Sequence, residues 1–401
     1  MNKPNYAIVG GGINGLAVAR QILIDHPEAQ VTLFEKESQV AAHQSSHNSG
    51  VVHAGLYYEP GSLKAKLCRR GVTLVKNYCL EHDLPYEECG KLVVALTEDE
   101  LPRLDAIYQK SLANNVPGVK MLYGDEIRTV EPNCIGVAAL HSPETAIVSY
   151  GQIAEHIASE LIRQGAVIEL NSPVAKIEQG SSHITLTLAN GRVYDRLFDY
   201  VVTCAGLQSD RLAANSGDSA TPKIIPFFGQ YYVVEEAYKH DVKGLIYPVP
   251  DPKYPFLGVH FTKRIDGEMT LGPNAFISKG RECYDGKKIN FGDVFDYLGY
   301  RGFWLFARKN IPAAIREMKT VFSQRNFVSE AAKYVPSLAH VKVSPATRGI
   351  RAQAMQPDGS LVDDFVINKQ GNITHIRNAP SPGATSSLAI AEYIVREVMQ
   401  P

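Results

Sequence analysis

The N-terminal stretch contains the pattern that most constrains the fold. A short apolar run over residues 6–9 is followed by glycines in GxGxxG spacing, at Gly10, Gly12 and Gly15, and then by an apolar helical stretch over residues 13–24. Glycine lets the chain turn sharply, lets a phosphate approach the backbone and lets the helix pack close to the strand. The order strand, tight turn, helix therefore predicts a Rossmann-like nucleotide-binding fold near the start of the chain.

An acidic residue stands where such a fold binds ribose. A second apolar run over residues 31–34 ends at Glu35, about 20 residues beyond Gly15, and a carboxylate there can bind the ribose hydroxyls. The N-terminus of the intervening helix offers unpaired N–H groups to a pyrophosphate. A carboxylate at this position disfavours a 2′-phosphate, so NADP is a poor fit.

The rest of the chain favours FAD over NAD. After Glu35 the sequence continues with a polar loop of small residues, 41–49, where an NAD domain usually adds strands and helices directly. A buried strand pattern ending in glycine, residues 200–206, returns to the same sheet, so we expect a discontinuous nucleotide domain. The turn-rich stretch 380–387 precedes a helical pattern over residues 388–398, and a helix N-terminus beside a flavin would favour the negative charge of its reduced form.

We find no second GxGxxG after a strand, so we expect the substrate itself to reduce the flavin, which argues against an NADPH-driven monooxygenase. The expected FAD-contacting residues are Gly10, Gly12, Gly15, Glu35, Lys36, Ser45, Ser46, His47, Asn48, Ser49, Val174, Ala205, Gly206, Gly383, Ala384 and Thr385.

Composition excludes several classes of function. The 401 residues have a formal net charge of −1, so a nucleic-acid partner is not expected. The six cysteines are scattered without the paired spacing of a metal site or a disulfide framework, so we expect no metal and a reducing compartment. No apolar run approaches the roughly 20 residues of a membrane-spanning helix, and only five residues precede the first strand pattern. These features predict a cytoplasmic protein that is soluble or sits on a membrane surface.

We predict an α/β chain, with α+β character, in two domains. Alternating short apolar runs with Pro and Gly turns, over residues 227–235, 244–261 and 269–272, indicate an antiparallel sheet that covers the flavin; residues 92–96 and 138–141 are expected to join it. The expected domain limits are 1–85, 145–212 and 340–401 for a discontinuous FAD-binding domain, and 86–144 and 213–339 for a substrate-binding domain.

Several stretches resemble one family of flavoproteins. The start of the chain is similar to FAD-dependent oxidoreductases of the D-amino acid oxidase type, with its glutathione reductase type 2 architecture. SSHNSGVVHAGLYY (45–58), YPVPDP (247–252), FLGVHF (256–261) and LGPN (271–274) resemble the L-2-hydroxyglutarate dehydrogenases, also called L-2-hydroxyglutarate oxidases. The resemblance spans nearly the whole chain. It implies FAD-dependent oxidation of L-2-hydroxyglutarate to 2-oxoglutarate and, because eukaryotic members carry a mitochondrial transit segment, a bacterial, cytoplasmic version.

Oxidation of a 2-hydroxy acid needs a proton acceptor near the hydroxyl while a hydride moves to the flavin. Histidine suits this role because its unperturbed pKa of roughly 6.5 leaves it largely neutral near physiological pH. His53, which closes the polar loop, and His260, in an alternating strand pattern, are the two candidates. Either could instead be a structural histidine, and His47 could contact the cofactor.

A dicarboxylate substrate also needs cationic anchors, and arginine can hold a carboxylate through two parallel hydrogen bonds. Arg351 is the first candidate, because the resemblance places its stretch in the active site, and is grouped with the histidines as catalytic. Arg348 is expected to bind substrate, while Lys263 and Arg264 are weaker candidates. Tyrosine hydroxyls that could contact substrate are those of Tyr57, Tyr58, Tyr231 and Tyr247, with Tyr57 and Tyr247 foremost.

The segment 291–319 raises the question of a partner. Its aromatic residues are Phe295, Tyr297, Tyr300, Phe303, Trp304 and Phe306, and its basic residues are Arg301, Arg308, Lys309, Arg316 and Lys319. Such a mixture can bind a protein to the surface of an anionic bilayer. A packed helical lobe with solvated charges would have the same composition. Docking at the cytoplasmic face of the inner membrane would bring a membrane quinone within reach as electron acceptor; a soluble enzyme would use oxygen.

Two other classes of function remain open. An FAD-dependent amino acid oxidase would use the same fold but bind an ammonium group. A non-catalytic flavoprotein would bind FAD and resist reduction by every substrate.

Overall fold

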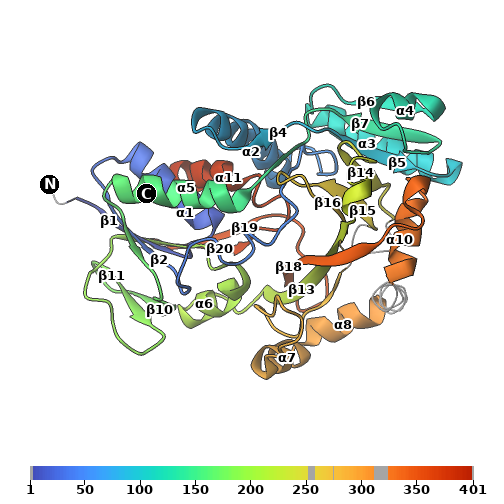
Figure 1. The fold of residues 1–401 in the computed structure, drawn as a ribbon. Helices are drawn as coiled ribbons and strands as arrows, with labels where there is room; N and C mark the ends of the chain where they lie inside the picture. Colours follow the sequence, from blue (N-terminus) through green and yellow to red (C-terminus); the bar gives the residue numbers. More distant parts are fainter. Residues whose placement is uncertain (1–2, 252–257, 274, 311–323, 400–401) are drawn as a thin grey trace.

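Two β-sheets lying side by side organise the molecule. The computed structural model describes residues 3–251, 258–273, 275–310 and 324–399 (Figure 1). Pro252, Phe256, Leu257 and Asn274, from the stretches of family resemblance, and residues 311–319 of the aromatic-basic segment lie outside the described residues.

The first sheet carries the predicted nucleotide-binding unit. Its strand order is β19-β20-β12-β1-β2-β9, and every neighbouring pair is parallel except β19 and β20. Its strands are β1 (Asn5–Val9), β2 (Gln30–Phe34), β9 (Val167–Glu169), β12 (Tyr200–Thr203), β19 (Val366–Gln370) and β20 (Ile373–Asn378). The strands come from three parts of the chain, which confirms the predicted discontinuous unit.

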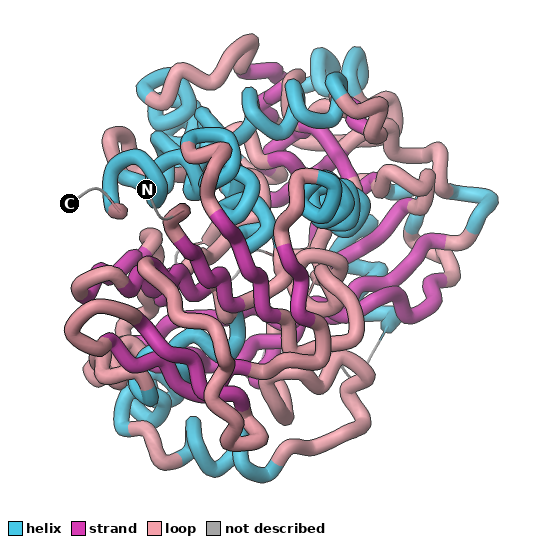
Figure 2. Tube along the Cα trace, turned by 90° about the vertical axis from the view of Figure 1, so that its left-hand side faces the viewer, coloured by secondary structure: helices cyan, strands magenta, loops and turns pink. Residues whose placement is uncertain are grey.

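Helices cover one face of this sheet (Figure 1). They are α1 (Ile13–Asp25), α2 (Leu63–Glu81), α5 (Tyr150–Arg163) and α11 (Ser387–Tyr393), which continues as a π-helical turn over Ile394–Val398. Helix α1 packs against α5 and α11 as well as the sheet, so most of its residues are buried. The opposite face is covered by the hairpin β10 (Val174–Gln179) and β11 (Ile184–Leu188) and by α6 (Ser209–Asn215). Both termini lie at the outer end of this half of the molecule, at the left of Figure 1 and on the side that faces the viewer in Figure 2.

The second sheet has nine strands and is almost entirely antiparallel. Its order is β17-β13-β16-β15-β14-β5-β7-β6, with β18 paired to β13; only β14 and β5 run parallel. Its strands are β5 (Lys91–Ala95), β6 (Lys120–Tyr123), β7 (Ala138–Ser142), β13 (Lys223–Val234), β14 (Leu245–Pro248), β15 (His260–Lys263), β16 (Met269–Gly272), β17 (Phe276–Ile277) and β18 (Val343–Met355).

Alternation of side chains gives the second sheet two apolar faces. Leu92 and Val94 of β5 pack toward α10 (Gln324–Ala332), whereas Val93 and Ala95 pack toward α3 (Leu101–Ala113). The short helix α4 (Ile127–Val130) completes this end of the molecule. At the other end, α7 (Phe291–Leu298) and α8 (Arg301–Lys309) pack on β13 and β18. A small third sheet, β3 (Val51–Val52), β8 (Ala146–Val148) and β4 (Tyr86–Glu87), lies where the chain passes between the halves.

The two sheets confirm the predicted two-domain α/β fold and its antiparallel second sheet. The strands expected over residues 92–96 and 138–141 are β5 and β7, and both join that sheet. The expected domain limits stay a prediction. Within them, β18 lies in the range 340–401 assigned to the FAD domain but pairs with β13 along most of its length, so this strand belongs to the second sheet (Figure 1).

Candidate active site

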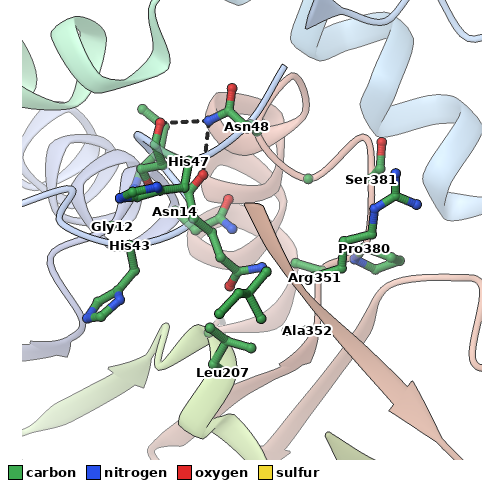
Figure 3. A pocket seen from close by; sticks show the side chains of 18 of the residues that line it. Gly12, Asn14, His43, His47, Asn48, Leu207, Arg351, Ala352, Pro380 and Ser381 are labelled. Atoms are coloured by element: carbon green, nitrogen blue, oxygen red, sulfur yellow. Dashed lines mark hydrogen bonds between the residues drawn. The ribbon is translucent and has the colours of Figure 1, made fainter. Parts of the chain in front are cut away.

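One cavity of about 940 Å³ joins the glycine-rich turn to the predicted catalytic residues. That volume lies at the upper end of the range for ligand pockets. Its lining comes from both sheets and from the polar loop and the C-terminal segment. Figure 3 shows labelled residues of the polar loop, of β18 and of the C-terminal segment around the same space.

Most of the expected cofactor residues line this cavity: Gly10, Gly12, Glu35, Lys36, Ser45, His47, Asn48, Ser49, Val174, Ala205, Gly206, Gly383, Ala384 and Thr385. Gly15 and Ser46 are not part of the lining. A Cβ on Gly15 would lie 1.9 Å from the carbonyl oxygen of Gly10, and Ser46 is packed beside Gly151 of α5. Gly15 therefore brings α1 against β1 without facing the cavity.

The glycine turn lies too close to the neighbouring backbone for side chains at Gly10 and Gly15. A Cβ on Gly10, which has φ +117°, would lie 2.3 Å from the carbonyl oxygen of Cys204. The Oγ of Ser45 accepts a hydrogen bond of 2.8 Å from the amide of Ile13 at the start of α1, and the Glu35 carboxylate accepts one of 2.7 Å from Gly11. The amides and the carboxylate that a dinucleotide needs thus converge at one end of the cavity, which fits the FAD expected there.

The polar loop is held by its own side chains (Figure 3). The Asn48 amide donates to the carbonyl oxygens of Gln44 and Ser45, at 2.9 and 2.7 Å, and its Oδ1 accepts from the amide of Gly50. His47 stacks on Tyr284 at 4.2 Å, and burial lowers the pKa of His47. The loop therefore follows the cavity wall instead of packing into a core.

The C-terminal segment connects the cofactor side to His53. The Thr385 hydroxyl lies 2.8 Å from the Tyr150 hydroxyl and accepts from the His53 amide at 3.2 Å. The Oγ of Ser381 lies 3.4 Å from Nε2 of His53. Burial, followed by the nearby charge of Lys91, holds the pKa of His53 well below its usual value. Tyr150 was not predicted from the sequence, because 235 residues separate it from Thr385.

His260 is buried and has a defined tautomer. It is 4% exposed, its Nδ1 donates to the carbonyl oxygen of Gly258 at 2.9 Å, and its ring stacks on Tyr247 at 4.0 Å. Since Nδ1 carries the proton, Nε2 is the acceptor. Burial lowers the pKa of His260 to about 3, so this imidazole is neutral at any physiological pH.

The two arginines of β18 have different surroundings. Arg351 lines the cavity and lies beside Pro380 and Ser381 (Figure 3). Arg348 does not line it: its guanidinium donates to Oε1 of Gln230 and to the carbonyl oxygen of Asp285. Positions three apart on a strand face opposite sides, so the two arginines do not converge on one substrate.

The other candidate cations are also directed elsewhere. Lys263 forms an ion pair with Glu87, and Arg264 pairs with Asp266; neither lines the cavity. By contrast, the four candidate tyrosines, Tyr57, Tyr58, Tyr231 and Tyr247, all line it.

Tyr57 and Lys64 offer polar atoms to a ligand. The Tyr57 hydroxyl is buried without a hydrogen-bond partner among the described residues, an arrangement that a bound polar group would satisfy. Lys64 lines the cavity, with its ammonium 2.8 Å from Asp363 and over the ring of Tyr58. The sequence analysis missed Lys64, whose buried position on α2 has no local signature.

Known proteins match the chain over nearly its whole length. The family profile of the FAD dependent oxidoreductases matches residues 5–397. Curated relatives are named L-2-hydroxyglutarate dehydrogenase: a mitochondrial one from Homo sapiens is 42% identical over 98% of this chain and 88% of its own. One from the bacterium Indibacter alkaliphilus is 40% identical over 96% of both chains.

Solved structures share the fold at low sequence identity. The L-alpha-glycerophosphate oxidase of Mycoplasma pneumoniae, determined with FAD bound, superposes with a TM-score of 0.76 at 22% identity, over 99% of this chain and 94% of its own. Glycine oxidase from Geobacillus kaustophilus gives 0.73 at 19%, over 98% and 94%. The architecture, the matched profile and the curated relatives agree with the resemblance seen in the sequence. The chain belongs to the FAD-dependent oxidoreductases and, within them, to the family of the L-2-hydroxyglutarate dehydrogenases.

Proposed function

We propose that this protein oxidises L-2-hydroxyglutarate to 2-oxoglutarate with FAD. The observation that carries the proposal is the meeting of two neutral histidines, an arginine and a tyrosine hydroxyl in the same cavity as the glycine turn. Curated relatives that match at least 96% of this chain are named L-2-hydroxyglutarate dehydrogenase. Bound FAD supplies the hydride acceptor for the hydrogen on the alpha carbon.

The protein's own residues would then accept the hydroxyl proton and bind the negatively charged carboxylate of the substrate. A neutral histidine takes the hydroxyl proton as the carbonyl forms. His260 offers Nε2 for this, because its Nδ1 is bound to the Gly258 carbonyl, and His53 lies beside the C-terminal segment, where its amide donates to Thr385. Low pKa values keep both imidazoles unprotonated near pH 7.

Arg351 is assigned to a substrate carboxylate. It comes from β18, the long strand between the two halves, and faces the C-terminal segment that lines the cofactor end (Figure 3). A fork of two parallel hydrogen bonds would fix the alpha carbon relative to the flavin. The hydroxyl of Tyr57 is a further donor at this site.

The test is a substrate panel with an artificial electron acceptor and identification of the product. L-2-hydroxyglutarate should be consumed with stoichiometric 2-oxoglutarate, and glycine, proline and other amino acids should not react. Turnover of amino acids with release of ammonia would instead support the amino acid oxidase alternative. FAD binding with no turnover of any compound would support the non-catalytic alternative.

For the electron acceptor we propose a membrane quinone, reached through α7 and α8. Phe291, Phe295 and Trp304 are 65%, 69% and 58% exposed on these helices, and Arg301 is exposed beside them. No helix among the described residues is long and apolar enough to cross a membrane, so binding would be peripheral. The bacterial, cytoplasmic location belongs to this proposal.

Flotation with anionic liposomes tests the docking. The wild-type protein should float, and replacement of Phe291, Phe295 and Trp304 by Ser should leave it at the bottom. A wild-type protein that stays at the bottom would favour oxygen or a soluble carrier as acceptor.

A further inference from the structure

Lys91 is a buried cation that the proposed mechanism does not use. It is the first residue of β5 and only 2% exposed, yet it forms no ion pair with any residue the structure describes. An ammonium removed from water without an opposite charge is strongly unfavourable. An anion that arrives from elsewhere would stabilise its charged form.

The ammonium lies over two rings of the cavity wall. Nζ is 4.3 Å from the ring centroid of Tyr247 and 5.1 Å from that of Tyr57, and both tyrosines line the cavity. Two aromatic faces stabilise a cation only partly. The ammonium therefore lies next to two rings that themselves line the cavity.

Strand register fixes this arrangement. Lys91 of β5 is opposite Leu245 of β14, and Ile246 of β14 is opposite Phe261 of β15. Directly opposed residues point to the same face of a sheet and successive residues alternate, so Lys91, Tyr247 and His260 share one face, with Lys91 diagonal to Tyr247. On that face the His260 ring stacks on Tyr247 at 4.0 Å.

Other charged and titratable groups also face this region. They are His53, Tyr57, Tyr58, Lys64, Cys68, Cys89, Tyr247, His260 and Arg351. Burial lowers the pKa of both histidines and raises that of the cysteines and tyrosines, so all of these are neutral near pH 7. The Lys64 ammonium is held by Asp363.

We propose that Lys91 is a positioning residue for a doubly charged substrate: behind the rings of Tyr57 and Tyr247, its ammonium supplies the positive charge that selects dicarboxylates over monocarboxylates. This inference rests on the proposed function, which requires a dicarboxylate. It adds a second cation to Arg351, so that each carboxylate has one. Since substrate, transition state and product all carry both carboxylates, loss of Lys91 should weaken binding far more than it slows hydride transfer.

The assignment predicts a pH dependence of binding. Burial lowers the pKa of Lys91 to about 7, so the ammonium is present below that pH and becomes a neutral amine above it. A bound dianion favours the charged form and shifts its loss to higher pH. Affinity for a dicarboxylate should therefore fall as pH rises, whereas affinity for a monocarboxylate held by Arg351 should change little.

Calorimetric titration of the FAD-loaded enzyme with glutarate, a dicarboxylate without a hydroxyl to oxidise, tests this without turnover. Between about pH 6 and pH 9, wild-type affinity should fall about 10- to 100-fold. K91M should bind weakly at every pH, and K91R should bind tightly at every pH because arginine keeps its charge. Lys66, exposed on α2, gives the matched control: K66M should behave as wild type. Butyrate should show no such dependence.

Two results would overturn the assignment: wild-type affinity for glutarate that does not change with pH, or K91M affinity equal to that of wild type. If K91M does not fold, the pH dependence of glutarate binding by the wild type and its absence in K91R still test the assignment. Oxidation of L-2-hydroxyglutarate is assayed in the same preparations. If the wild type oxidises L-2-hydroxyglutarate but K91M binds glutarate as tightly as the wild type does, only this inference fails. If wild type neither binds glutarate nor oxidises the hydroxy acid, the proposed function fails as well.

Discussion

Replacement of Thr385 by Val should destabilise the protein through a single hydroxyl. Thr385 is 1% exposed, and its Oγ1 meets the Tyr150 hydroxyl at 2.8 Å and the His53 amide at 3.2 Å. Valine keeps the shape but removes both bonds, together with a longer contact of 3.4 Å to the Val51 carbonyl oxygen. The net contribution of each hydrogen bond to the free energy of unfolding is about 0.5 to 1.5 kcal/mol, and a buried amide left unpaired costs about 1 to 3 kcal/mol. We therefore expect a loss of roughly 2 to 4 kcal/mol in the free energy of unfolding.

Urea unfolding of the FAD-loaded protein, at fixed FAD concentration, measures this loss. Thr187, half-buried on β11 and without a side-chain hydrogen bond among the described residues, provides a matched control, and T187V should change stability by less than about 0.5 kcal/mol. Y150F and the double variant complete a cycle. Because the two hydroxyls share a bond, the two losses should be less than additive; strict additivity would refute the contact.

Three further predictions concern the cavity. G15A should abolish FAD binding, measured by flavin absorbance of the purified protein, because its Cβ would lie 1.9 Å from the Gly10 carbonyl oxygen; stoichiometric flavin in G15A would contradict the close approach. R351M should raise the Kd for L-2-hydroxyglutarate in rapid-mixing experiments about 100-fold, with partial recovery in R351K; an unchanged Kd would remove Arg351 from the carboxylate. As pH falls from about 6.5 toward 5, the free energy of unfolding should drop by about 1.4 kcal/mol per pH unit for each buried neutral histidine. The reason is that histidines of the unfolded chain bind protons in this range, whereas His260 in the folded protein, with a pKa of about 3, does not. Denaturant curves of H260N should show a shallower drop; an identical slope would mean that His260 is charged in the folded state.

The sequence predicted the nucleotide-binding half well because its chemistry is local. The spacing of Gly10, Gly12 and Gly15 and the carboxylate of Glu35 are dictated by one turn and the two strands beside it. The structure puts all of these in one unit. The antiparallel second sheet was also predictable, because alternation of apolar residues with Pro and Gly turns is a local pattern.

The polar network around the substrate end was not predictable in this way. Lys64 and Lys91 are lysines, and a lysine in a sequence is normally assigned to the surface; only the packing of α2 and β5 buries them. Arg348 and Arg351 look equivalent in the sequence. Their roles separate only once β18 is known to be a strand through both positions, with neighbouring side chains on opposite faces.

The most direct test of the account is an anaerobic titration of the flavin. The purified yellow enzyme is mixed with L-2-hydroxyglutarate or with its D enantiomer, and the flavin absorbance is followed. We predict rapid bleaching by the L enantiomer, none by the D enantiomer, and one 2-oxoglutarate formed per flavin reduced. A flavin that stays oxidised in the presence of the L enantiomer would contradict the proposed reaction.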